Sequence, residues 1–139
     1  MPYNIVVSND TMVFRGVMER PSRREVINKV TEAIDAIQEG KRQIPFSKHF
    51  TQDQSDLGIE DTSNLWPLLM VLLEEIKELG PNELYTGGRP PEKSYEVGLK
   101  GYELWAYSWD SPVMNSKMYL KFIMRKGNYF YMGCHKSKF

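Results

Sequence analysis

From residue 22 onward, the hydrophobic period of this chain of 139 residues changes from helical to strand-like at the turn-rich segment 86–91. Before that segment, apolar residues recur with the spacing of amphipathic helices. After it, aromatic and polar residues alternate as they do in β-strands. Because the helical segments precede a run of strands, the pattern predicts an α+β fold in which helices pack on a C-terminal sheet.

Two helices are expected in the first part of the chain. Ser22 is a good N-cap and Glu25 occupies the capping-box position, so the first helix is predicted to begin there and to end at Gly40. The second helix is predicted over residues 61–79, where leucine and isoleucine form a buried stripe that Gly80 ends. Its candidate N-caps are Asp61, Thr62 and Ser63.

The remaining segments predict a hairpin, a loop and four strands. Residues 3–8 and 12–17 flank an Asn-Asp pair and favour an N-terminal hairpin. Residues 41–60 favour a loop with a short helix at 52–57. We expect one domain over residues 1–139, in which the hairpin and the two helices precede a C-terminal antiparallel sheet. Its strands are predicted at 94–99, 102–109, 118–125 and 128–135, the last two joined by a tight turn.

The composition excludes several classes of protein. No apolar run reaches the roughly 18 residues that a membrane-spanning helix requires. The N-terminus lacks a basic leader followed by an apolar stretch, so we expect a cytoplasmic protein with no membrane partner. Cys134 is the single cysteine, and the only histidines are His49 and His135. We therefore expect no internal disulfide, no metal site and no cofactor.

The charges are unevenly distributed along the chain. It holds 18 basic and 18 acidic side chains in all. Residues 111–139 contain six of the bases and none of the acids, which leaves residues 1–110 with a balance of minus six. The C-terminal part is therefore the expected landing site for the phosphates of a nucleic acid.

Alternation along the last two predicted strands indicates one apolar face and one face of tyrosines and cations. Cations bind phosphate and flat rings stack on unpaired bases, which is the combination used in single-stranded RNA binding. An alternative is that these aromatic residues pack in the core and that the basic edge only discourages aggregation. The residues predicted to bind RNA are Trp105, Tyr107, Lys117, Lys121, Arg125, Tyr129 and Tyr131.

Short motifs between residues 56 and 138 resemble those of a known family of bacterial toxins. They are Leu-Gly at 57–58, Leu-Tyr at 84–85, Leu-Trp at 104–105, Asp-Ser-Pro at 110–112, Tyr-Leu-Lys at 119–121 and His-Lys-Ser-Lys at 135–138. In this order and around an apolar helix, they are similar to the MqsR family within the wider RelE-like ribonuclease fold. The resemblance implies a RelE-like arrangement of the helices and the sheet.

The same resemblance implies the activity of an mRNA interferase. This is a metal-independent endoribonuclease in which the ribose 2′-hydroxyl attacks the adjacent phosphate. By their places in the motifs, Tyr119 and Lys136 match residues of the family's active site, and Lys93 matches the lysine of the family's Lys-Ser pair, which is at 93–94 here. The two lysines would stabilise the charge of the phosphorane, while Tyr119 or His135 would handle a proton. Imidazole exchanges protons near neutral pH, so His135 is the better shuttle. The implied partners are single-stranded mRNA and a cognate antitoxin protein.

Ala106 occupies the position at which the family has a catalytic glutamine. Because this side chain is missing, we also consider functions without catalysis. One alternative is a non-catalytic inhibitor that binds a protein, such as an immunity protein, an antitoxin or a phage-encoded inhibitor. The acidic helix predicted over residues 61–79 would then form the interface. Another alternative is passive RNA binding by the same sheet, without strand scission.

Overall fold

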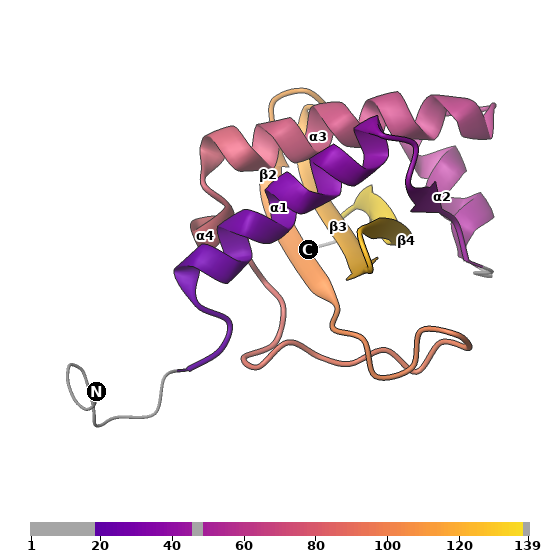
Figure 1. The fold of residues 1–139 in the computed structure, drawn as a ribbon. Helices are drawn as coiled ribbons and strands as arrows, with labels where there is room; N and C mark the ends of the chain where they lie inside the picture. The colour runs from indigo at the N-terminus through magenta and orange to yellow at the C-terminus, as the bar shows by residue number, and fades with distance from the viewer. Residues whose placement is uncertain (1–18, 46–48, 138–139) are drawn as a thin grey trace, which may run out of the picture.

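The fold is α+β, as the sequence predicted, with helices followed by a C-terminal sheet (Figure 1). The computed structural model describes residues 19–45 and 49–137. The hairpin predicted over residues 3–8 and 12–17 lies outside the described residues. No helix in the described part of the chain is long and apolar enough to cross a bilayer.

The helices and strands have the following bounds. The helices are α1 (Arg23–Gln38), α2 (Phe50–Leu57), α3 (Leu65–Leu79) and α4 (Pro81–Leu84), and the 3₁₀ turn η1 (Thr62–Asn64) leads into α3. The strands are β1 (Arg42–Gln43), β2 (Trp105–Ser111), β3 (Ser116–Arg125) and β4 (Asn128–Lys136), in the spatial order β1-β4-β3-β2.

Helix α1 begins where the sequence predicted, whereas α3 begins at Leu65, after a 3₁₀ turn that occupies the first residues of the predicted helix. The Ser22 hydroxyl accepts a hydrogen bond from the backbone N–H of Glu25 at 3.1 Å, and the Glu25 carboxylate accepts one from the Ser22 N–H at 3.2 Å. This capping box satisfies two donors that the first turn of α1 would otherwise leave free. Asp61 caps η1 through a 2.9 Å bond from the Ser63 N–H.

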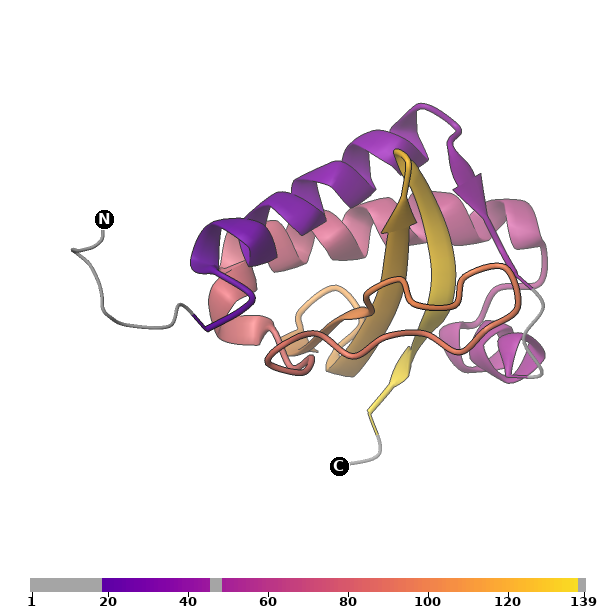
Figure 2. The same cartoon turned by 60° about the horizontal axis from the view of Figure 1, so that its bottom comes forward.

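Helices α1 and α3 cover one face of the sheet, and the core lies between them and the strands (Figures 1 and 2). Aromatic rings of the sheet extend this core. The ring of Phe122 stacks on Tyr107 at 6.1 Å on one side and on Tyr129 at 5.1 Å on the other. Burying each such side chain stabilises the fold by roughly 1.5–3 kcal/mol.

The β3–β4 hairpin sets the register of the sheet. Lys126 and Gly127 have φ values of 50° and 79°, the left-handed pair that a two-residue type I′ turn requires. Arg125 therefore pairs with Asn128, and the pairing continues until the register shifts next to Lys121. Because Lys121 pairs with Gly133 and the next residue of β3 pairs with Tyr131, Met132 is an extra residue, a β-bulge.

The structure differs from the prediction in three segments. The strand predicted at 94–99 is wrong, because Gly98 and Gly101 have φ values of 82° and 86° and the chain reverses around them. The N–H of Gly101 binds back to the carbonyl of Ser94 at 2.9 Å. Helix α4 was not predicted. Strand β1 was not predicted either, and its parallel pairing with β4 makes the sheet mixed rather than purely antiparallel.

Residues 85–104, here called the crossing segment, pass over the face of the sheet opposite α1 and α3 (Figure 2, coral to orange). Leu99 packs there against Ile123 and Phe130. Where the segment begins, the Thr86 N–H donates to the carbonyl of Ala106 at 2.9 Å, so it also covers the free edge of β2. The crossing segment leaves part of this outer face open.

Candidate active site

The open part of the outer face forms a groove between α2 and the crossing segment. Two adjoining pockets, of about 350 and 110 Å³, share Tyr119 and Lys121 of β3 and together make up this outer-face groove. The larger pocket is also lined by His49, Gln52, Asp53, Asp56, His135 and Lys136, and the smaller one by Gly87, Gly88, Glu92 and Ala106.

Strand pairing places the central side chains of the groove. Tyr119 lies opposite His135 in the β3–β4 ladder, so both side chains are on the outer face, with their ring centroids 5.3 Å apart. Lys121 lies opposite Gly133, which has no side chain. The Lys121 ammonium therefore has room beside it where a larger residue would fill the groove.

Helix α2 closes one end of the groove through two carboxylates. The Asp53 carboxylate is buried and accepts bonds from the Tyr131 hydroxyl at 2.7 Å and the Cys134 N–H at 3.2 Å. The Asp56 carboxylate accepts a 2.6 Å bond from the backbone N–H of Lys136. These bonds satisfy N–H groups of β4 beyond its short pairing with β1, and they hold α2 against the strand.

Backbone of the crossing segment forms the opposite wall. The Tyr85 hydroxyl donates to the Gly88 carbonyl at 2.6 Å. A Cβ at Gly87 would lie 2.5 Å from that hydroxyl oxygen, and a Cβ at Gly88 would lie 2.6 Å from the carbonyl oxygen of Pro90. Both positions therefore require glycine, and the wall offers peptide groups to a ligand instead of side chains. Glu92 follows on the same wall.

The groove combines cations, a protonated hydroxyl and acid–base groups. Burial raises the pKa of Tyr119, and the nearby Glu92 carboxylate raises it further, so this hydroxyl is a hydrogen-bond donor at neutral pH. Lys121 and Lys136 supply positive charge, while Glu92 and His135 are groups that exchange protons. Among the described residues, no three His, Cys, Asp or Glu side chains are grouped so as to hold a metal ion.

The structure brings together three of the four residues that the resemblance implied as catalytic. Tyr119, His135 and Lys136 line the larger pocket. His135 and Lys136 are neighbours on β4, but Lys136 is the last residue of the strand, and both reach this pocket. Lys93 is not part of the groove. Its backbone pairs with that of Glu103, and its side chain lines a separate pocket. Successive side chains of extended backbone point to opposite sides, so Lys93 points away from the groove that Glu92 lines.

The predicted aromatic platform for bases is wrong. Trp105, Tyr107, Tyr129 and Tyr131 are buried in the core on the face that α1 and α3 cover. The two-residue turn sets Tyr129 opposite Met124 of the apolar face, and Tyr131 follows with the same orientation. Rings that are packed in this way have no surface on which an RNA base could stack.

The cations predicted to bind RNA separate into three environments. Lys121 lies in the groove, whereas Lys117 is exposed at the far end of β3. Arg125 donates to the carbonyl of Gly98 at 2.6 Å, and its guanidinium lies 4.9 Å from the ring centroid of Phe130. Arg125 therefore ties the crossing segment to the sheet, and of these three cations only Lys121 lines the groove.

Several residues of the groove were not predicted from the sequence. Glu92 precedes Lys93, and strand-like alternation turns it toward Tyr119. Asp53, Asp56 and His49 reach the site because α2 docks beside β4. No local motif marks this docking, although the short helix itself was predicted.

Compared with family models, curated proteins and solved structures, the chain shows no match in any of the three. The fold and the groove define an α+β protein whose sheet carries lysine, tyrosine and histidine along an open groove, with a glutamate on the wall formed by the crossing segment.

Proposed function

We propose that the chain is an endoribonuclease that cleaves single-stranded mRNA through the ribose 2′-hydroxyl, as the resemblance to MqsR-like toxins implies. One observation carries the proposal: Tyr119, Lys121, His135 and Lys136 line the same pocket, on the open face of the sheet. This reaction takes its nucleophile from the substrate, so the protein needs only positioning, proton transfer and positive charge.

In the proposed reaction, the 2′-oxygen attacks the adjacent phosphorus and the bond from phosphorus to the 5′-oxygen breaks. The products are a 2′,3′-cyclic phosphate and a 5′-hydroxyl. A base removes the proton of the 2′-hydroxyl, and an acid returns one to the leaving 5′-oxygen. Two groups with opposite roles must therefore flank the phosphate.

Glu92 and His135 are suited to these two roles. Both neighbour Tyr119, the first through its charge and the second through ring contact, and they line adjoining pockets of the groove. In this assignment Glu92 is the base, and His135 in its protonated form is the acid. Lys121 lies where the two pockets meet and, with Lys136, stabilises the charge of the phosphorane.

The groove also offers a group near the position of the missing glutamine. Ala106 and Glu92 line the same small pocket, so the Glu92 carboxylate is available beside the site where the family has an amide. The proposal extends to the partners that the resemblance implies. The substrate is a single-stranded mRNA, and a cognate antitoxin protein controls the enzyme in the cytoplasm.

The test is a set of single-turnover cleavage rates on a mixed-sequence single-stranded RNA. Proton-transfer groups contribute about 10²–10⁴-fold, so His135→Ala and Glu92→Gln are each expected to slow cleavage at least 100-fold. Lys121→Ala is expected to slow it to a similar extent. Lys93→Ala and Lys117→Ala are the matched controls, because both remove a lysine outside the groove, and they are expected to leave the rate unchanged.

Three results would count against the proposal. Intact RNA after incubation with excess protein would reject the activity. Equal losses in Lys121→Ala and in the two lysine controls would show that only general positive charge matters. Affinity for RNA that falls with salt concentration, without any scission, would identify passive binding instead.

A further inference from the structure

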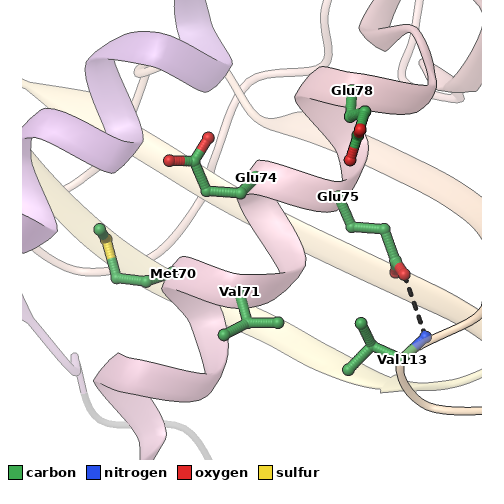
Figure 3. Close-up of a pocket in the computed structure, with 6 residues that line it drawn as sticks. All are labelled: Met70, Val71, Glu74, Glu75, Glu78 and Val113. Atoms are coloured by element: carbon green, nitrogen blue, oxygen red, sulfur yellow. Dashed lines mark hydrogen bonds between the residues drawn. The ribbon is translucent and has the colours of Figure 1, made fainter.

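A shallow hollow of about 380 Å³ lies between the exposed side of α3 and the turn that joins β2 to β3. Figure 3 shows its lining, in which glutamates from successive turns of α3 lie beside apolar side chains. We call it the α3 groove. Its lining residues are Met70, Val71, Glu74, Glu75, Glu78 and Val113.

Glu75 fixes the shape of the α3 groove. Its carboxylate accepts hydrogen bonds from Trp109 Nε1 at 2.7 Å, from the Ser111 hydroxyl at 2.5 Å and from the Val113 N–H at 3.0 Å, the last drawn in Figure 3. Burial raises the pKa of Glu75, but these three bonds outweigh it and lower the pKa below its ordinary value. The turn is therefore held against α3, and the groove is formed before any partner arrives.

Apolar side chains face solvent on both sides of this groove. Val71 of α3 is 46% exposed, and Val113 of the turn is 53% exposed. Met70 is partly buried beside them. Single exposed apolar residues are common on protein surfaces, but these gather around one preformed hollow. These three side chains can therefore contact an apolar side chain of another molecule.

The rim of the α3 groove is acidic. Glu74 and Glu78 are exposed and stand four residues apart on one helix, where two like charges destabilise the helix slightly. Within the described part of the chain, neither forms an ion pair with a cation. No lysine or arginine lines the groove. The positive charge that complements this acidic surface must therefore come from another molecule.

We propose that the α3 groove binds a basic amphipathic helix of a partner protein. An apolar side chain of that helix seats between Val71 and Val113, and flanking lysines or arginines bind Glu74 and Glu78. Positions 71 to 78 span two turns, about 10 Å, which suits a helix laid into a groove. This inference is independent of the proposed cleavage of RNA, because the α3 groove and the outer-face groove share no residue.

The test uses a fluorescent synthetic helix of about 18 residues, with leucines along one face and lysines and arginines beside them. Fluorescence anisotropy of this peptide measures its affinity for the full chain. The variant Glu74→Lys/Glu78→Lys is expected to weaken binding about tenfold or more. The control Glu60→Lys/Glu96→Lys changes the net charge equally at exposed positions outside the groove. It is expected to change the affinity less than threefold.

A second pair of measurements separates the apolar contact from the charge. Val71→Ser is expected to weaken binding at least fivefold, while a peptide with its leucines replaced by serine is expected not to bind. The proposal is overturned by equal weakening in the groove variant and the control, or by the absence of saturable binding. It is also overturned if sedimentation shows that copies of the chain associate through this face and that Val71→Ser abolishes the association.

Discussion

Replacing Tyr129 or Tyr131 by phenylalanine is the same chemical change, but we expect the two replacements to have opposite effects on stability. Both rings are buried, at 0% and 1% exposure, on the helix-covered face of β4. The Tyr129 hydroxyl is buried without a hydrogen-bond partner among the described residues. The Tyr131 hydroxyl donates to the Asp53 carboxylate at 2.7 Å. Replacing each tyrosine by phenylalanine removes one oxygen and leaves the ring.

The expected magnitudes follow from these partners. A buried hydroxyl without a partner costs about 1–3 kcal/mol in desolvation, so Tyr129→Phe is expected to raise the free energy of unfolding by about 1 kcal/mol. A hydrogen bond to a carboxylate contributes about 1.5–3 kcal/mol, so Tyr131→Phe is expected to lower it by about 2 kcal/mol. The two variants should therefore differ by about 3 kcal/mol, or roughly 10 °C in Tm.

Equilibrium urea unfolding, followed by circular dichroism and by tryptophan fluorescence, measures both changes. The slope with urea should stay constant, which shows that only stability has changed. Tyr95→Phe is the matched control, because Tyr95 is 89% exposed and its loss should shift stability by less than about 0.5 kcal/mol. A Tyr129→Phe variant that is destabilised by more than 1 kcal/mol, or a neutral Tyr131→Phe, would refute the reasoning.

Three further predictions follow from buried or hydrogen-bonded groups. Burial raises the pKa of Tyr107 and of Tyr129 in the folded protein, so their contribution to stability is fully present below pH about 10 and is lost above it, at about 1.4 kcal/mol per pH unit for each tyrosine. Urea titrations between pH 9 and 11 measure this loss, and a flat profile would contradict it. The pH dependence that comes from Glu75 is the opposite, because its pKa is lowered in the folded protein. Its contribution to stability is present above pH about 4.3 and is lost as the pH falls through its pKa in the folded protein. Glu75→Ala should therefore destabilise the protein by about 2–3 kcal/mol at pH 7 and by less as the pH falls below about 4.3, and a loss that does not change with pH would be inconsistent with it. Burial also raises the pKa of the Cys134 thiol, so its alkylation should follow the rate of unfolding, and rapid labelling of the folded protein would exclude this burial.

Local patterns predicted the two long helices and the last hairpin. Ser22 and Glu25 lie three residues apart and mark the first helix, and the Lys126-Gly127 turn marks the hairpin. The orientation of the tyrosines was missed, although the same turn contains the information. A strict two-residue turn pairs Arg125 with Asn128, and the next pair sets Tyr129 against the apolar face. The error came from assigning faces to each strand separately.

Other features depend on contacts that no local pattern contains. The bulge at Met132 restores His135 to the same face as Tyr119, and no periodicity in the sequence marks it. Asp53 reaches β4 only because α2 packs against that strand. Its hydrogen-bond partner Tyr131 lies 78 residues further along the chain. Glu92 enters the groove because the crossing segment lies over the sheet. The pairing of β3 with β4 was therefore predictable, whereas the bulge in that hairpin and the two walls of the groove were not.

The most direct test of the central claim is mass spectrometry of the ends that the protein leaves on RNA. The substrate is a mixed-sequence single-stranded RNA, compared with the same sequence carrying 2′-O-methyl groups. We predict 2′,3′-cyclic phosphate and 5′-hydroxyl ends from the RNA, no products from the methylated strand, and none above background with His135→Ala/Lys121→Ala. Intact RNA, or fragments with 3′-hydroxyl and 5′-phosphate ends, would contradict the assignment of the outer-face groove.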